Sequence, residues 1–130
     1  MPGYEIRKLD DMEGIYGGLY KRARAELGVT SFGLGIVDMP PNLDAYPEHD
    51  HSTDGQEEVY IVVRGAGEIQ IDGESFPLDD ETAVAVRSGT KRKIIAGPEG
   101  LRFIAIGGTP GEAYAPPDMS QLGAPDPAAA

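Results

Sequence analysis

The only two histidines of this 130-residue chain, His49 and His51, lie two positions apart, and a pair of carboxylates, Glu57 and Glu58, follows them. Residues i and i+2 of an extended strand point to the same face, so we expect the two imidazoles to project together. Two imidazoles supply half of a metal site. Glu58 is the expected third ligand, reached if the histidine strand pairs with the strand that Glu58 opens, whereas a bulge there would substitute Glu57.

Two histidines and one carboxylate are typical of non-haem iron sites, and manganese, zinc or nickel also fit these ligands. A histidine on a strand is more often a satisfied polar residue, so the pattern alone leaves a metal-free polar cluster open as the alternative. Cysteine is absent, which excludes thiolate ligands, disulfides and cysteine nucleophiles. No nucleophile elbow and no phosphate-binding glycine loop occurs, and the catalytic residues stay unknown.

The elements that must position these residues are predicted to be short strands separated by turns. Glu58–Val63 is rich in β-branched and aromatic residues, and Asp72-Gly73 between apolar runs predicts a tight hairpin. One helix is expected over Gly18–Gly28, closed by its last glycine. The other expected strands are Tyr4–Leu9, Ser31–Met39, Ile69–Ile71, Ser75–Leu78, Thr82–Val86, Lys93–Ala96 and Leu101–Ile106. Strands at intervals of about 8–12 residues predict an antiparallel sandwich or barrel.

The histidine region resembles the first motif of the cupin superfamily, G-x5-H-x-H-x3,4-E-x6-G. His49 and His51 match the two histidines, and Glu58 with Gly65 six residues beyond it matches the E-x6-G half. This second spacing also favours Glu58 as the ligand. Six residues separate the histidine pair from the glutamate where the motif has three or four, and Gly55 can absorb the extra turn.

The resemblance extends from Ser31 to Gly107 and includes the centre of the second cupin motif, G-x5-P-x-G-x2-H-x3-N. Gly89 matches its glycine, whereas Arg87 stands at the proline position and Arg92 at the position of the last histidine ligand. The leading glycine of the first motif is also replaced, by Leu43.

Similarity to cupins implies an all-β fold, a single antiparallel jelly-roll (double-stranded β-helix) barrel, here with a short N-terminal helix. It implies a divalent transition metal (iron, manganese, zinc or nickel) held by His49, His51 and Glu58. Isomerase, cyclase and dioxygenase chemistry all occur among cupins, so whether this chain is an enzyme stays open. The alternative is a non-catalytic, metal-free binding or sensor module with the same fold.

Arg92 cannot replace the histidine ligand, because a guanidinium is a permanent cation that cannot bind a metal. Three arrangements of its side chain are open. It can pair with Glu58 and leave no metal, turn outward, or point inward and hold an anionic group of a ligand with its planar fork. Tyr46 and Tyr60 are further expected ligand-binding residues, Tyr46 near the barrel mouth and Tyr60 on the face of Glu58. Asp54 is expected to be a surface charge.

The formal net charge of −11 argues against nucleic acid and anionic membranes as partners. We expect a small-molecule ligand and a homodimer joined through Tyr4–Leu9, as cupins often pair N-terminal strands. The N-terminus lacks a signal-peptide pattern and no apolar run suffices for a membrane span, so a soluble cytoplasmic protein is expected. One domain, residues 1–114, is predicted, followed by a Pro/Ala-rich tail, residues 115–130, that is extended or disordered.

Overall fold

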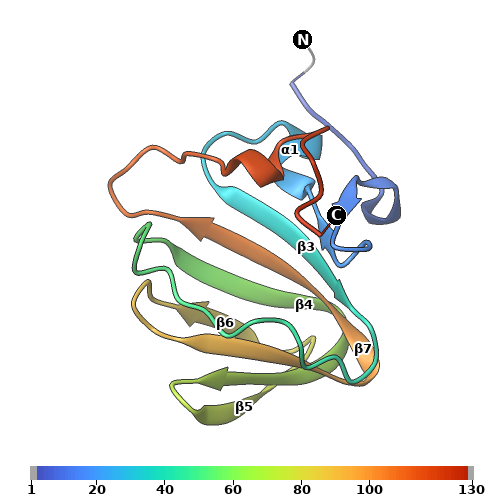
Figure 1. The fold of residues 1–130 in the computed structure, drawn as a ribbon, viewed down its shortest axis with the longest axis vertical. Helices are drawn as coiled ribbons and strands as arrows, with labels where there is room; N and C mark the ends of the chain where they lie inside the picture. Colours follow the sequence, from blue (N-terminus) through green and yellow to red (C-terminus); the bar gives the residue numbers. More distant parts are fainter. Residues whose placement is uncertain (1–2, 129–130) are drawn as a thin grey trace.

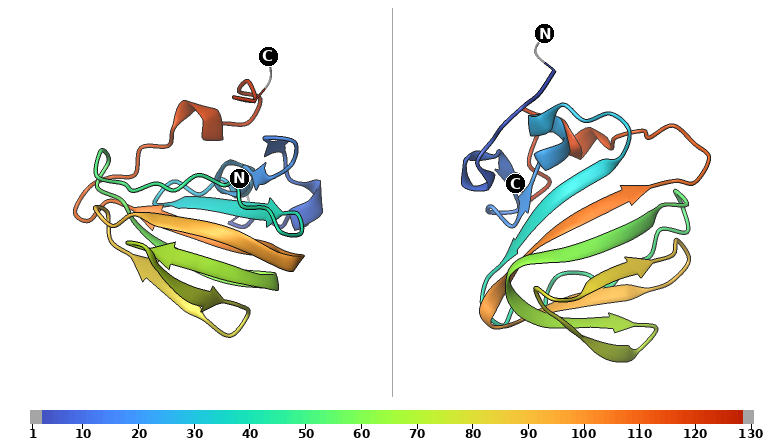
Figure 2. Two further views of the ribbon diagram at one scale, coloured as in Figure 1. Left: turned by 60° about the horizontal axis from the view of Figure 1, so that its bottom comes forward. Right: turned by 180° about the vertical axis from the view of Figure 1, so that it is seen from behind.

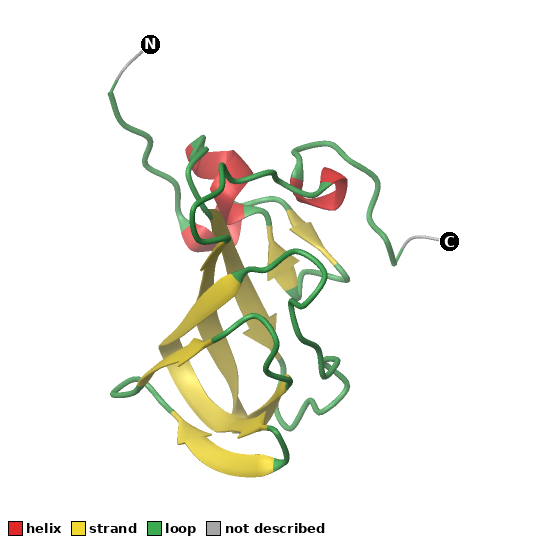
Figure 3. Ribbon diagram, turned by 90° about the vertical axis from the view of Figure 1, so that its left-hand side faces the viewer, coloured by secondary structure: helices red, strands yellow, loops and turns green. Residues whose placement is uncertain are grey.

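The structure, a computed structural model, describes residues 3–128 and consists mainly of antiparallel strands (Figure 1). The strands are β1 (Gly14–Ile15), β2 (Tyr20–Lys21), β3 (Gly33–Met39), β4 (Glu57–Ile71), β5 (Glu74–Leu78), β6 (Ala83–Val86) and β7 (Arg92–Gly108). The helices are α1 (Ala23–Leu27) and two single-turn 3₁₀ helices, η1 (Leu9–Asp11) and η2 (Asp118–Ser120). The helical segments gather at one end of the strands (Figure 3).

The two long strands, β4 and β7, connect the fold, because each pairs with different neighbours in its first and its second half. The strand order is β1-β2-β3-β7-β4-β5, and β6 pairs with β4 as well. The first half of β4 lies between β6 and the second half of β7, while the second half of β4 lies between β5 and the first half of β7. All of these pairings are antiparallel, which confirms the expected all-β class.

Glycines allow β4 and β7 to bend at the point where the pairing changes, since the register shifts on either side of Gly65. Gly65 has a φ of 79°, and a Cβ there would lie 2.2 Å from the main-chain oxygen of Gly100. At Gly67 a Cβ would lie 2.2 Å from the oxygen of Ile95. Real Cβ atoms do not approach backbone oxygens so closely, so the bend excludes larger residues at both positions.

The main core lies on the concave side of the bent strands and is mostly aliphatic. Its aromatic centre is the pair Tyr60 and Phe103, whose rings meet edge to face with centroids 5.7 Å apart. The other buried members are Val37, Met39, Val62, Ile69, Leu78, Val86, Ile94, Ala96 and Leu101. Alternate residues of β4 and β7 therefore fill the interior, as a period of two requires.

Two of the expected elements are wrong in the N-terminal region. The expected strand Tyr4–Leu9 does not form, because residues 4–8 have no regular structure and Leu9 begins η1. The expected helix over Gly18–Gly28 is reduced to α1, and its first part is taken by β2. The helix does end as expected, since Gly28 has a left-handed φ of 69°.

The C-terminal segment, residues 113–128, runs beside the N-terminal elements rather than away from the barrel (Figure 2). It contains η2 and a turn closed by the hydrogen bond from the amide of Ala124 to the oxygen of Gln121, and Ser120 is buried. Its closest partner is Arg22, whose side chain is only 2% exposed and donates to the main-chain oxygens of Met119 and Ala124 at 2.8 and 2.9 Å. Among residues 3–128, no helix is long and apolar enough to cross a membrane.

Candidate metal centre

The two histidines lie on a short extended segment that runs against the start of β7. His49 and Arg92 exchange both main-chain hydrogen bonds at 2.9 Å, and the amide of His51 donates to the oxygen of Ser88 at 2.7 Å. The expected pairing of this segment with β4 is therefore wrong. After His51 the chain turns through Gly55, which has a φ of 72°, before β4 begins. The expected role of Gly55 in the longer loop is confirmed.

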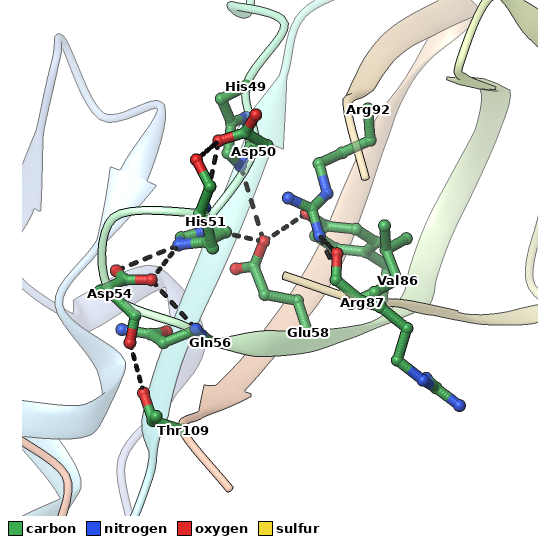
Figure 4. Close-up of polar contacts among 12 residues, drawn as sticks. His49, Asp50, His51, Asp54, Gln56, Glu58, Val86, Arg87, Arg92 and Thr109 are labelled. Atoms are coloured by element: carbon green, nitrogen blue, oxygen red, sulfur yellow. Dashed lines mark hydrogen bonds and ion pairs between the residues drawn. The ribbon is translucent and has the colours of Figure 1, made fainter. Parts of the chain in front are cut away.

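The side chains of His49, His51 and Glu58 nevertheless converge, as Figure 4 shows. One ligand atom from each residue lies within 4.8 Å of the other two. His51 Nε2 is 2.9 Å from Oε1 of Glu58, and His49 Nε2 is 3.5 Å from the same oxygen. The three groups come from two different parts of the barrel, so the folded chain preassembles them.

The remaining ring nitrogens have partners that fix the orientation of each imidazole. His51 Nδ1 lies 3.1 Å from both carboxylate oxygens of Asp54, and His49 Nδ1 lies 3.2 Å from the main-chain oxygen of Pro47. In the tautomer in which both Nδ1 atoms donate, the Nε2 lone pairs are directed toward Glu58, and this is the tautomer that a metal requires. Asp54, expected to be only a surface charge, thus orients a candidate ligand.

His51 Nε2 supplies a test of whether the cluster suits a metal ion. Its 2.9 Å contact with Glu58 lacks the orientation of a hydrogen bond, so this buried nitrogen has no hydrogen-bond partner within residues 3–128. A buried polar atom without a partner costs free energy, and a divalent cation would accept its lone pair. Two neutral imidazoles and one carboxylate therefore form a donor set that fits the expected ion.

Glu58 is kept ionised by its surroundings. Burial by itself would raise the pKa of this carboxyl, but contacts with His49, His51 and Tyr60 outweigh that effect and hold the pKa well below its ordinary value. The hydroxyl of Tyr60 donates to Oε1 of Glu58 at 2.6 Å. Tyr60 is only 1% exposed, and burial beside this carboxylate raises the pKa of its phenol. Tyr60 therefore orients the carboxylate.

Arg92 points into the protein and is fully buried. Its Nη2 lies 3.4 and 3.2 Å from the main-chain oxygens of Val86 and Arg87, whereas Nε and Nη1 have no partner within residues 3–128 (Figure 4). No ion pair with Glu58 forms in this part of the chain, so of the three expected arrangements the structure shows the inward one. Two donors of a buried cation thus lack a protein partner in the described part of the chain, and Arg92 is not among the residues that line the cavity beside the candidate ligands.

A cavity of about 210 Å³ adjoins the three candidate ligands, with Tyr46 at its edge. Tyr20 and Tyr114, which the sequence did not single out, also line it. The phenol of Tyr114 lies over Gly33, and the phenol of Tyr20 lies over Gly35, where a Cβ would be 2.9 and 2.5 Å away from their nearest atoms. Gly33 and Gly35 alternate on one face of β3, and this pattern could have indicated from the sequence that other side chains cover that face.

The fold and the site together define a small antiparallel β-barrel protein with a pocket lined by two histidines and one carboxylate. Residues 35–107 match the cupin domain family, and this chain belongs to that family. The departures from its motifs, above all Arg92, do not prevent the match.

Solved structures confirm that this is the cupin jelly-roll fold. A cupin protein from Bacteroides fragilis superimposes with a TM-score of 0.69 at 22% identity, covering 90% of this chain and 93% of that one. A sugar phosphate isomerase of the cupin superfamily from Silicibacter pomeroyi gives 0.68 at 19% identity, covering 86% and 77%. A protein from Photorhabdus luminescens gives 0.62 at 20% identity, covering 82% and 88%. Comparison with curated protein sequences gives no significant match.

Proposed function

We propose that this cupin binds a divalent transition metal through His49, His51 and Glu58, together with a small anionic or oxygen-rich organic ligand. The observation that carries the proposal is the convergence of three ligand atoms, one of them the buried Nε2 of His51, which has no hydrogen-bond partner within residues 3–128. Iron, manganese, zinc or nickel would supply Lewis-acid or redox chemistry there, polarising a carbonyl or enolate or activating oxygen. Isomerase, cyclase and dioxygenase reactions all remain compatible with the site.

The anionic character of the ligand follows from Arg92. Nε and Nη1 of its buried guanidinium, which have no partner within residues 3–128, can each donate a hydrogen bond to an oxygen of a carboxylate or phosphate. Tyr46, at the cavity edge next to His49, adds a phenol whose pKa is raised by burial, so it stays a neutral hydrogen-bond donor. The sugar phosphate isomerase from Silicibacter pomeroyi has an anionic substrate by its description, which agrees with this ligand class.

One observation favours a second candidate, a metal-free binding or sensor module. Oε1 of Glu58 already accepts a hydrogen bond from Tyr60 and lies close to both imidazoles, so protonated histidines can satisfy this carboxylate without an ion. In that case the histidines and Arg92 would contact the ligand directly.

Metal analysis of protein purified without a histidine tag separates the two functions. The first predicts a stoichiometric transition metal that is lost in the double variant His49→Ala/His51→Ala, and a thermal midpoint that rises with added metal. Glu58→Gln should also lose the metal, whereas Glu57→Gln, the same change at an exposed neighbour, should retain it. A metal-free protein whose midpoint ignores zinc, iron, manganese and nickel would establish the second function instead.

We also propose a homodimer and a cytoplasmic location. Tyr4 and Ile6 are 70% and 78% exposed on a segment outside the sheet, and Ile61 and Val63 are exposed on β4. Apolar side chains in these positions favour contact with a second copy. Light scattering should give twice the 13.8 kDa mass of one chain, and the Ile6→Lys variant should have the mass of a single chain. A single-chain mass for the wild type would reject the dimer.

Cell fractionation tests the proposed location. Recovery of the protein outside the cytoplasmic fraction would reject it.

A further inference from the structure

A second cavity meets the metal cavity at His49 and differs from it in chemistry. It has a volume of about 480 Å³, against about 210 Å³ for the cavity beside the candidate ligands. Four residues line both spaces: Tyr20, Tyr46, His49 and Met119. A molecule that reaches the Nε2 of His49 can therefore extend from one space into the other.

The larger cavity has apolar walls, although the chain as a whole carries a formal charge of −11. It is lined mainly by Tyr16, Leu19, Leu43, Tyr46, Pro47 and Met119. His49 contributes its only imidazole, and no carboxylate, ammonium or guanidinium lines it within residues 3–128. Such walls favour an uncharged hydrocarbon or aromatic group and provide little for a second charged one.

The walls are held in place from both sides, so the space is part of the folded structure. Leu19, Leu43 and Tyr46 pack against the main core, and the Tyr46 ring meets Phe103 edge to face with centroids 6.3 Å apart. The roof is Met119 of the C-terminal segment, fixed by the hydrogen bond from Arg22 to its main-chain oxygen.

We propose that the ligand is bipartite: a metal-binding, anionic head beside His49, His51 and Glu58, and a compact apolar body in the cavity beneath Met119. A cavity of about 480 Å³ holds a group the size of a substituted aromatic ring. The inference rests on the proposed function for the head of the ligand. The apolar body follows from the larger cavity alone.

Two chelators that differ only in the body test the inference on cobalt-loaded protein. Benzohydroxamate should bind at least about tenfold more tightly than acetohydroxamate, since a buried aromatic ring adds more than 1.4 kcal/mol of apolar contact. Ala45→Phe, which fills the cavity from an exposed wall position, should bring the ratio of the two affinities close to one. Ala83→Phe, the same change at an exposed position of β6, should leave the ratio unchanged. Equal affinities in the wild type, or an unchanged ratio in Ala45→Phe, would overturn the inference.

A metal-free experiment separates failure of this inference from failure of metal binding. With [¹³C]methyl-methionine protein, benzyl alcohol should shift the Met119 resonance, while the buried Met12 and Met39 serve as internal references. Ala45→Phe should abolish the shift. If Met119 does not respond, or responds equally in Ala45→Phe, the apolar subsite is rejected whether or not the protein binds a metal.

Discussion

Arg22 and Met119 lie 97 positions apart in the sequence, and the guanidinium Nε of Arg22 donates to the main-chain oxygen of Met119. Nη1 of the same side chain lies 2.7 Å from Oε2 of Glu13, which in turn accepts from the amide of Gly123 at 3.0 Å. A buried cation and one carboxylate thus hold the C-terminal segment over the site. Tyr114 and Met119 of this segment line the cavity beside the candidate ligands, so we expect the contacts of Arg22, called the latch below, to limit access to that cavity.

Removing the guanidinium should open the site without changing its ligands. In Arg22→Met we expect both histidines to react with diethyl pyrocarbonate about tenfold faster, because each lost hydrogen bond to a charged group contributes about 1.5–3 kcal/mol to the closed state. The chain has only two histidines, so mass spectrometry of the modified peptides reads out this site alone.

The matched control for the latch is Arg7→Met, which removes an arginine that is half exposed and pairs with Glu5. Its histidines should react at the wild-type rate. If Arg22→Met also reacts at that rate while its C-terminal segment resists limited proteolysis as before, the segment is not held by Arg22.

Replacing Arg92 should separate stability from ligand binding. In Arg92→Met a buried cation, two of whose nitrogens have no partner among residues 3–128, is exchanged for an apolar chain, so the free energy of unfolding should stay within about 1 kcal/mol of the wild type or rise. Oxalate binding to the cobalt-loaded protein should weaken about tenfold or more, since charge-assisted hydrogen bonds from the guanidinium are lost. Calorimetry of the wild type and of Arg92→Met measures both the free energy of unfolding and the affinity for oxalate.

The control for this change is Arg87→Met, because Arg87 is exposed and precedes the same turn. It should leave oxalate affinity within about twofold of wild type, as expected for a screened surface charge. Marked destabilisation of Arg92→Met together with unchanged oxalate affinity would make Arg92 a purely structural residue.

The sequence placed most strand segments of the barrel, because they alternate and some carry their own turn signals. Asp72 and Gly73, for example, adopt the positive φ values of 50° and 85° that the Asp-Gly hairpin requires. The sequence divided the two long strands, however: Glu58–Val63 and Ile69–Ile71 are parts of the continuous β4, and Lys93–Ala96 and Leu101–Ile106 are parts of the continuous β7. It also predicted that His49, His51 and Glu58 converge, since the cupin spacing links Glu58 to Gly65. What it could not predict is long-range pairing: His49 meets Arg92, and Met119 meets Arg22, through contacts whose partners are distant in sequence and carry no local pattern.

Gly65 should be the least replaceable glycine of the barrel. In Gly65→Ala the new Cβ meets the main-chain oxygen of Gly100 at 2.2 Å and the residue keeps a positive φ, so a loss of about 4 kcal/mol or more in the free energy of unfolding is expected. Gly73→Ala has a similar φ of 85° but nothing within 4 Å, and should cost only about 1–2 kcal/mol. Denaturant titrations of the two variants compare them directly, and equal losses would show that the close approach at the bend is not the cause.

The metal-free and metal-bound proteins should respond to pH in opposite directions. In the free protein the carboxylate of Glu58 raises the pKa of His51 above 6.5, with burial opposing, while the pKa of Glu58 itself is depressed. The raised pKa of His51 stabilises the fold fully at pH values below the unfolded histidine pKa, and this contribution is lost as pH rises through the folded pKa. The depressed pKa of Glu58 stabilises the fold fully above the unfolded carboxyl pKa, and this contribution is lost as pH falls from there through the folded pKa. A metal needs both imidazoles neutral, so the rise in thermal midpoint caused by saturating zinc should grow from about pH 6 to about pH 8.

Thermal scans from about pH 6 to about pH 8, with and without zinc, measure the pH dependence of the metal-free protein and of the zinc effect. Glu58→Gln is the control, in which both pH dependences should flatten. A zinc effect that is constant across this range would mean that neither imidazole binds the ion.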